Sequence, residues 1–332
     1  MLSADIAVLA PFFSRQLIES WHQEFDSLTQ LCSSTQTAKI HTKLTQVRPL
    51  HADENYLTFV DSQWPDILNQ VEPGIPCIYY EGNLSLLSQN CILGVVGSRT
   101  VTAYGAKSLN LLTPLLANGL ITLSGLAYGI DTLVHQLAIE HNAPTIAIIG
   151  GGLGSDTFYP KEHWSVRTKI LEKSGLLLSE YPRGVKPLPY HFPLRNRLIA
   201  ALASKLLIIQ ASLKSGTLIT AELALQLGKD ILTLPAELDN PHFAGNIKLL
   251  QNGAVLIASS EDIAQFIGFS LKNTKSISNT DTPLLQMLGT SPQTTSSIAE
   301  QLGVSLSQVL VELTTLEISG LVRQDGQFWT RF

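Results

Sequence analysis

The sequence lacks long apolar runs, a leader-like start and paired cysteines, and each absence excludes a class of protein. No run of about 18 apolar residues is free of charges and helix breakers, so we expect no membrane span. The segment MLSADIAVLAPFF has no basic residues before its apolar stretch and carries Asp5 within it, which argues against a secretory signal peptide. Cys32, Cys77 and Cys91 show neither metal-ligand spacing nor a disulfide framework, which is typical of the reducing cytoplasm.

Charge is also scarce, at 15% of the 332 residues, and the net charge of −5 argues against nucleic acid as a partner of the whole chain. The charge is unevenly distributed, however. Residues 94–258 carry 14 Lys or Arg against 10 Asp or Glu, whereas residues 1–93 have a net charge of −6 and residues 259–332 of −3. We therefore expect an anionic partner to bind the middle of the chain. A solvated surface of mixed charge is the alternative, because an excess of four cations is modest.

The pattern of apolar residues predicts three parts. Residues 5–31 have apolar positions three and four apart, so we interpret 1–55 as a small acidic helical module. Continuous apolar strands then alternate with helices, which indicates a doubly wound, mostly parallel sheet in an α/β domain over 56–268. The predicted strands are 91–97, 119–125, 145–151, 175–181, 206–211, 230–236 and 254–258, and the predicted helices include 104–119, 128–142, 196–204 and 218–228.

The C-terminal part reads as a linker followed by a compact domain. Residues 269–282 are rich in Ser, Thr and Asn, which is typical of a linker. Residues 283–332 follow the order helix, glycine turn, helix and hairpin of a winged helix. Its second helix carries Glu312 and Glu317 but no Lys or Arg, whereas a DNA recognition helix normally needs cations. We therefore favour a protein-contact or regulatory role for this domain.

Three segments could hold an anion, because ligands of open α/β sheets bind beyond the carboxyl ends of the strands. Gly97, Ser98 and Arg99 follow the first predicted strand and precede a helix, although Gly97 alone could simply make a tight turn. Arg195, Asn196 and Arg197 stand before the apolar run LIAALA. The third segment opens the helix after the strand at 206–211 and offers backbone, hydroxyl and ammonium donors; it consists of Lys214, Ser215, Gly216 and Thr217.

Other residues carry weaker signals. We interpret Asp131 as a helix cap and His135 as a structural histidine. The glycines at 150, 152 and 154 do not have the spacing of a dinucleotide-binding motif, and no P-loop is present. The anion-binding segments are accompanied by no carboxylate pair, nucleophile–base pair or metal cluster. We therefore expect no catalytic residues, metal or cofactor, and we favour binding over catalysis.

Taken together and in this order, four segments resemble the DNA-processing protein A family, also called DprA or Smf: GVVGSRTVTAYG, SGLAYGIDTLVHQLAI, FPLRNRLIAALA and LKSGTLITAELALQLGK. The resemblance extends from about Trp64 to Ala258. It implies an extended Rossmann-like fold, an N-terminal module of sterile-alpha-motif type and a C-terminal winged helix. It also implies a cytoplasmic homodimer, joined through the Rossmann domain, that binds single-stranded DNA, protects incoming DNA and loads the RecA recombinase in natural transformation.

The resemblance also assigns residues. It implies that Arg99, Arg195 and Arg197 line a basic pocket, that Lys214, Ser215 and Gly216 hold phosphates, and that Gly125 and Gly129 shape the floor. Side chains two positions apart do not share a helix face. We therefore expect one of Arg195 and Arg197 to face DNA and the other to be held by an acidic neighbour, and the sequence leaves open which. Candidates for stacking with bases are Tyr104, Tyr128, Tyr159, Tyr190, His191 and Phe192.

The sequence departs from the family pattern at three places. Gln210 replaces the usual acidic residue, Pro235-Ala236 replaces Pro-Gly, and the loop GGGLGSDTFYP is longer, with its aspartate displaced to Asp156. The alternative function is that of a nucleotide-cleaving enzyme, because phosphoribohydrolases with a related fold carry a PGGxGTxxE signature. The nearest match, GGGLGSDTF, lacks the catalytic glutamate.

Overall fold

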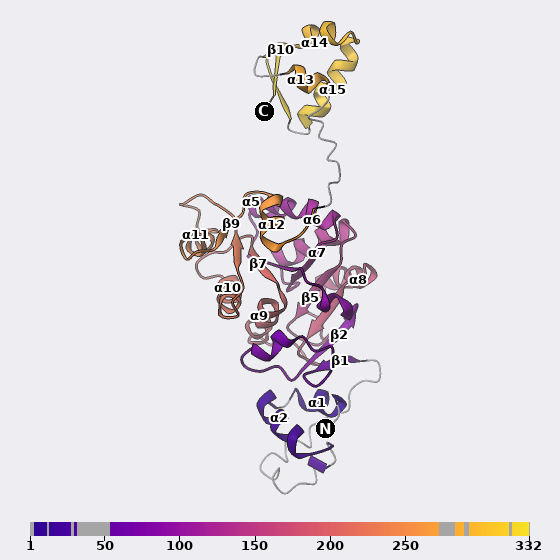
Figure 1. Cartoon of the computed structure of the whole chain (residues 1–332), viewed down its shortest axis with the longest axis vertical. Helices are drawn as coiled ribbons and strands as arrows, with labels where there is room; N and C mark the ends of the chain where they lie inside the picture. Colours follow the sequence, from indigo (N-terminus) through magenta and orange to yellow (C-terminus); the bar gives the residue numbers. More distant parts are fainter. Residues whose placement is uncertain are drawn as a thin grey trace. The chain divides into compact units, whose positions relative to one another are not determined.

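The computed structural model describes residues 3–11, 13–27, 30–31, 54–271, 283–288, 292–318 and 321–331. The chain divides into two compact units, Met1–Leu271 and Lys272–Phe332 (Figure 1). Most of the expected linker, residues 272–282, and residues 32–53 of the expected N-terminal module lie outside the described residues. No helix among the described residues has the length and apolar character needed to cross a lipid bilayer.

A nine-stranded sheet forms the centre of the first unit, in the order β1-β2-β6-β5-β4-β3-β7-β8-β9. Neighbouring strands are parallel from β6 across to β9, whereas β1 and β2 are antiparallel additions at one edge. The strands are β1 (Asn55–Thr58), β2 (Cys77–Gly82), β3 (Ile92–Val96), β4 (Ile121–Ser124), β5 (Thr145–Ile149), β6 (Leu176–Ser179), β7 (Lys205–Ile208), β8 (Ile231–Thr233) and β9 (Val255–Leu256). The seven predicted strands and the mostly parallel sheet are thereby confirmed.

The sequence did not predict β1 and β2, because proline and glycine turn signals dominate the segment before residue 77. The long helix predicted over 104–119 is divided into three consecutive pieces, α5, η4 and α6. The helices of the sheet domain are η2 (Asp66–Gln70), η3 (Leu84–Ser88), α5 (Ala103–Ser108), η4 (Leu109–Leu112), α6 (Thr113–Ala117), α7 (Ile130–Glu140), η5 (Lys161–His163), α8 (Trp164–Glu172), α9 (His191–Leu202), α10 (Gly216–Gln226), α11 (Ala244–Gln251) and α12 (Ser260–Ile267).

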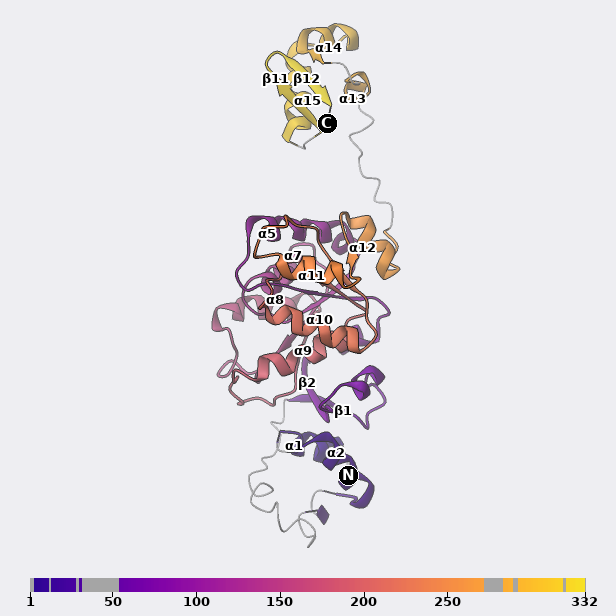
Figure 2. The same ribbon diagram turned by 90° about the vertical axis from the view of Figure 1, so that its left-hand side faces the viewer.

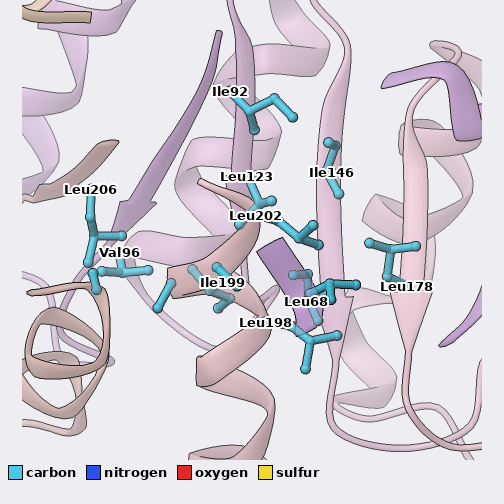
Figure 3. Packing of buried hydrophobic residues seen from close by; sticks show 14 of the residues in the cluster. Leu68, Ile92, Val96, Leu123, Ile146, Leu178, Leu198, Ile199, Leu202 and Leu206 are labelled. Atoms are coloured by element: carbon cyan, nitrogen blue, oxygen red, sulfur yellow. The ribbon is translucent and has the colours of Figure 1, made fainter. Parts of the chain in front are cut away.

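Both faces of the sheet are buried, which explains why its strands read as continuous apolar runs. Alternate residues of β3 belong to different cores: Ile92 and Val96 lie in one, and Leu93 and Val95 in the other. Helices α9 and α10 cover the first face, and α6 and α7 cover the second. Figure 2 shows α9 and α10 side by side, with α7 on the other side of the domain. Side chains of α9 reach the strands at the centre of the first core, among them Leu198, Ile199 and Leu202 (Figure 3). The run that follows Arg197 is therefore a helix buried against the sheet.

The described part of the N-terminal segment contains the helices α1 (Ser3–Leu9) and α2 (Arg15–Glu24), with Pro11 between them, and residues 30–31 are helical as well. Their apolar residues form a small core in which the rings of Phe13 and Trp21 lie 5.0 Å apart, edge to face. The Tyr79 hydroxyl of β2 donates to the carbonyl of Ala7 at 2.7 Å, which fastens α1 to the edge of the sheet. The sterile-alpha-motif character of residues 1–55 stays a prediction.

The second unit has the predicted winged-helix pattern. A three-stranded sheet in the order β10-β12-β11 packs with three helices around the buried side chain of Trp329. Gly303, with φ of +68°, makes the turn between α14 and α15, and Gly326 makes the hairpin turn. The elements are α13 (Pro283–Met287), β10 (Gln293–Thr294), α14 (Thr295–Leu302), α15 (Leu306–Ile318), β11 (Val322–Asp325) and β12 (Phe328–Arg331). Helix α15 exposes Leu306, Leu310 and Val311.

Candidate functional site

The strand order reverses its direction of growth between β3 and β7. From β3 the chain adds β4, β5 and β6 on one side, and from β7 it adds β8 and β9 on the other. Loops at such a switch point diverge and leave a crevice at the carboxyl ends of the strands. A cavity of about 380 Å³ lies there. It is lined by Val96, Gly97, Ser98, Arg99, Thr100, Ala127, Asp131, Phe192, Pro193, Arg195, Asn196, Ile199, Ser212, Ser215, Gly216, Thr217, Ile219 and Thr220.

This cavity brings together residues of all three predicted anion-binding segments. The predicted residues that line it are Gly97, Ser98, Arg99, Arg195, Asn196, Ser215, Gly216 and Thr217. Gly125, Gly129, Arg197 and Lys214 are not among its lining residues. The hydroxyl groups of Thr100, Ser212 and Thr220 were missed, although each lies within a few residues of a predicted segment. Proximity to a strand end in sequence was the signal that could have found them.

The two glycines behind the cavity allow close packing of its loops. Gly129 has φ of +81°, and a Cβ atom there would lie 2.3 Å from the carbonyl oxygen of Ser98. A Cβ atom on Gly125 would lie 2.3 Å from Nη1 of Arg195. These contacts fit the supporting role that the resemblance implied for Gly125 and Gly129. Gly216 differs, because a Cβ atom there would meet nothing within 4 Å.

Gln210, at the end of β7, holds the loop that carries Arg99. Its Oε1 accepts from the backbone N–H and the hydroxyl of Thr102, both at 3.0 Å. Its Nε2 donates to the carbonyl of Thr100 at 2.9 Å. A carboxylate could not make this last bond, because it has no proton to donate. Gln210 is fully buried, and its three hydrogen bonds join the end of β7 to the Arg99 loop.

Arg195 is 4% exposed and forms part of the cavity wall. Its Nη1 donates to the carbonyls of Gly125 and Ile148, and its Nε donates to Oδ1 of Asn196 at 3.2 Å. Burial lowers the pKa of Arg195 to about 10, and nearby Arg99 adds to this shift while Asp131 opposes it. The guanidinium therefore stays charged at neutral pH and supplies a fixed positive potential at the cavity.

Asp131 has a different role from the helix cap that was predicted. Gly129 occupies the cap position of α7, and the Asp131 carboxylate accepts from the backbone N–H of Gly125 at 3.2 Å. Burial raises the pKa of Asp131, and the charge of Arg195 opposes that shift. The carboxylate thus compensates the buried Arg195 guanidinium and fixes the turn after β4.

His135 is fully buried on α7, in agreement with the structural role predicted for it. Its Nδ1 lies 2.8 Å from the hydroxyl of Thr145, and its Nε2 has no hydrogen-bond partner among the described residues. Burial, the charge of Arg195 and His163 together lower the pKa of His135 to about 3. The imidazole is therefore neutral in the folded protein.

We predict that this histidine destabilises the protein in acid. Below a pH of about 6.5, its ordinary pKa, the His135 imidazole binds a proton in the unfolded chain but stays neutral in the folded one. The free energy of unfolding therefore falls as the pH is lowered. Between pH 7 and pH 5 the loss from this group should reach about 2 kcal/mol. Urea titrations at both pH values, on the wild type and His135→Phe, isolate this contribution. An equal loss in both proteins would contradict the assignment.

Arg197 points away from the cavity and is held in an ion pair. Its Nη2 contacts Oε2 of Glu180, and the two side chains are 8% and 12% exposed. Burial raises the pKa of Glu180 to about 7, and Arg197 only partly offsets this shift. Glu180 is the acidic neighbour that the sequence predicted for one of the two arginines. The structure therefore brings Arg195 to the cavity and leaves Arg197 outside it.

Helix α10 begins at the cavity with Ser215 as its N-cap. The Ser215 hydroxyl accepts from the backbone N–H of Thr217 at 3.2 Å and donates to the Thr217 hydroxyl at 2.9 Å. Lys214 is exposed in the preceding turn, beside the cavity rather than in its wall. The start of α10 thus offers hydroxyl groups and a helix N-terminus to an anion, with the exposed cation Lys214 next to them.

The middle of the glycine-rich loop after β5 lies away from the switch-point cavity. Gly154, Ser155 and Asp156 line a second hollow of about 290 Å³, together with Glu81, Trp164, Arg167, Arg183 and Leu153. The chain there is closely packed, since a Cβ atom on Gly152 would lie 2.5 Å from the carbonyl oxygen of Pro182. Close packing therefore explains the glycines of this loop without a bound dinucleotide.

Comparisons with known proteins agree with this architecture. Residues 55–268 match the family model described as DNA recombination-mediator protein A, and residues 273–326 match the DprA winged helix domain. The chain is 33% identical over 290 residues to Protein Smf of Escherichia coli, covering 82% of this chain and 76% of that protein. It is 37% identical over 223 residues to DNA processing protein DprA of Streptococcus pneumoniae, covering 66% of this chain and 78% of that protein.

Two solved structures are similar as well. The X-ray structure of DNA processing protein A from Streptococcus pneumoniae has a TM-score of 0.70 and 30% identity, covering 82% of this chain and 99% of that one. The protein from Helicobacter pylori, described as having a unique single-stranded DNA binding mode, has a TM-score of 0.58 and 28% identity, covering 65% and 96%. The chain belongs to the DNA recombination-mediator protein A family.

Proposed function

We propose that this protein binds single-stranded DNA at the switch-point cavity. The observation that carries the proposal is the convergence there of Arg99, Arg195 and a group of hydroxyls, within the only segment of the chain that is net basic. Arginine and hydroxyl donors match phosphate oxygens. The relative from Helicobacter pylori, described as binding single-stranded DNA, supports this choice of partner.

Membership of the family supports a wider role. We propose that the protein acts in the cytoplasm as a homodimer joined through the Rossmann-like domain, protects incoming DNA in natural transformation and loads the RecA recombinase. We assign the winged helix to protein contacts, since α15 exposes Leu306, Leu310 and Val311 and bears no Lys or Arg. Residues 97–99, 125, 129, 195–196 and 214–217 form or support the proposed interface; Arg197 takes no part in it.

We propose binding rather than catalysis. The loop that corresponds to the phosphoribohydrolase signature has Phe158 at the position of the catalytic glutamate, and its residues 153–156 line the second hollow rather than the switch-point cavity. The carboxylate that does line the cavity, Asp131, accepts from the backbone N–H of Gly125 and compensates the charge of Arg195. Steady release of base from a nucleoside monophosphate by the purified protein would favour the enzyme.

A salt titration tests the proposal. Fluorescence anisotropy with single-stranded and duplex oligonucleotides of equal length should show tighter binding of the single strand. The logarithm of its association constant should fall linearly with the logarithm of salt concentration, with a slope of about −0.7 for each phosphate contacted. Equal affinity for both forms, or an affinity that salt does not change, would contradict the proposal.

A further inference from the structure

Three aromatic side chains stand in a row beside the cavity. The Arg99 guanidinium carbon lies 5.8 Å from the ring centroid of Phe192. The Phe192 ring lies 5.7 Å from that of Tyr159, which in turn lies 6.4 Å from that of Tyr128, nearly perpendicular to it. The Tyr128 hydroxyl donates to Glu162 at 2.9 Å. Phe192, Tyr159 and Tyr128, which we call the aromatic shelf, are thus held by one another and by a carboxylate.

The shelf continues the cavity. A shallow hollow of about 10 Å³ is lined by all three rings and shares Arg99 and Arg195 with the cavity. As the side chains stand it is too small to enclose a nucleobase, so the surface that it offers to a base is its rim. Tyr159 and Tyr128 are 46% and 38% exposed, so their ring surfaces are available there. Aromatic rings in this setting bind bases by stacking, which tolerates any sequence.

We propose that the aromatic shelf is a binding site for unpaired nucleobases, with Tyr159 as its main contact; this inference rests on the proposed function of the cavity. A phosphate held by Arg99 places the neighbouring nucleotide beside Phe192 and Tyr159, because Arg99 belongs to both hollows. In a duplex the bases already stack on each other and cannot reach these rings. Base stacking on the shelf would therefore favour single strands over duplexes. Phosphate contacts alone do not supply this preference.

The other aromatic candidates have different surroundings. Tyr104 is as exposed as Tyr159, but its ring packs against Phe243, its hydroxyl donates to the carbonyl of Pro235, and it lines neither hollow. His191 is buried and stacked on Tyr181 at 3.9 Å. Tyr190 is exposed but also lines neither hollow. Tyr104 is therefore a matched control for Tyr159.

The test compares Tyr159→Leu, Tyr159→Phe and Tyr104→Leu with the wild type in anisotropy titrations. Loss of one stacked base should weaken single-strand binding by Tyr159→Leu about 5- to 100-fold. Tyr159→Phe should keep the wild-type affinity because it keeps the ring, and Tyr104→Leu should do so because it lies elsewhere. The salt slope of Tyr159→Leu should equal that of the wild type, because its phosphate contacts are intact. Melting curves establish that each variant is folded.

An oligonucleotide with abasic positions supplies a second readout. Wild type and Tyr159→Leu should bind it with the same affinity, since it offers no base to stack. Equal binding of the normal strand by Tyr159→Leu and Tyr104→Leu, while the wild type still prefers single strands, would overturn the shelf and leave the cavity proposal standing. Failure of the wild type to bind any single strand would instead overturn the proposed function itself.

Discussion

Arg99→Ala is expected to weaken single-strand binding about 10- to 100-fold, the cost of losing a hydrogen-bonded contact between charged groups. Arg99 is an exposed cation in the cavity wall, and Gln210 fixes the loop that carries it. The variant should also lose about 0.7 from the magnitude of its salt slope, the share of one phosphate. Anisotropy titrations at several salt concentrations measure both quantities.

Lys173→Ala is the matched control for Arg99→Ala. Lys173 is an exposed cation between α8 and the start of β6, at the rim of the sheet opposite to the cavity, where it contacts Asn142. Its removal changes the net charge by the same amount and should leave the affinity almost unchanged. Lys214→Ala, like Arg99→Ala, should weaken single-strand binding. Wild-type affinity and slope in both Arg99→Ala and Lys214→Ala would refute the assignment of the interface.

Arg197→Met is expected to lower the free energy of unfolding by about 3–5 kcal/mol, because it leaves a buried carboxylate without its partner. The pKa of Glu180, already raised to about 7 by burial, should rise further without the guanidinium. The variant should then regain stability as the pH is lowered from about 8 to about 6, as Glu180 takes up a proton. Urea titrations at the two pH values measure this.

The double variant Arg197→Met, Glu180→Leu separates the ion pair from the interface. Replacing both charges by apolar side chains of similar size should restore most of the stability, since neither partner is then buried alone. Single-strand affinity of the folded double variant should match the wild type, because Arg197 lies outside the cavity wall. A loss of affinity comparable to that of Arg99→Ala would show that Arg197 does belong to the interface.

For the sheet domain, the sequence predicted which strands and helices are present better than it predicted where each one begins and ends. Its strands are apolar on both faces, so they stand out from the helices between them. The antiparallel strands β1 and β2 were missed, because short strands between proline and glycine turns carry a weak signal. The helical pattern predicted over residues 5–31 did not show the break at Pro11, since the apolar spacing continues across it.

The candidate site was predicted as three segments, and the cavity unites residues from all of them. Parallel strands present their carboxyl ends at one rim, so residues after β3 and β7 had to come close. The sequence could not predict which of the two neighbouring arginines lines the cavity and which is held in an ion pair. Arg195 and Arg197 belong to the same buried helix, but the Arg195 guanidinium donates to the carbonyls of Gly125 and Ile148, whereas that of Arg197 pairs with Glu180.

By itself the sequence determined the α/β class, the winged helix, the basic middle segment and the resemblance that led to the family, because periodicity, composition and local motifs are written along the chain. Only the tertiary structure decided which cations share a cavity, that Gln210 ties the Arg99 loop, and that Tyr159 rather than Tyr104 lies beside Arg99. Those choices depend on contacts between segments far apart in sequence, and only the packing of helices on the sheet brings them together.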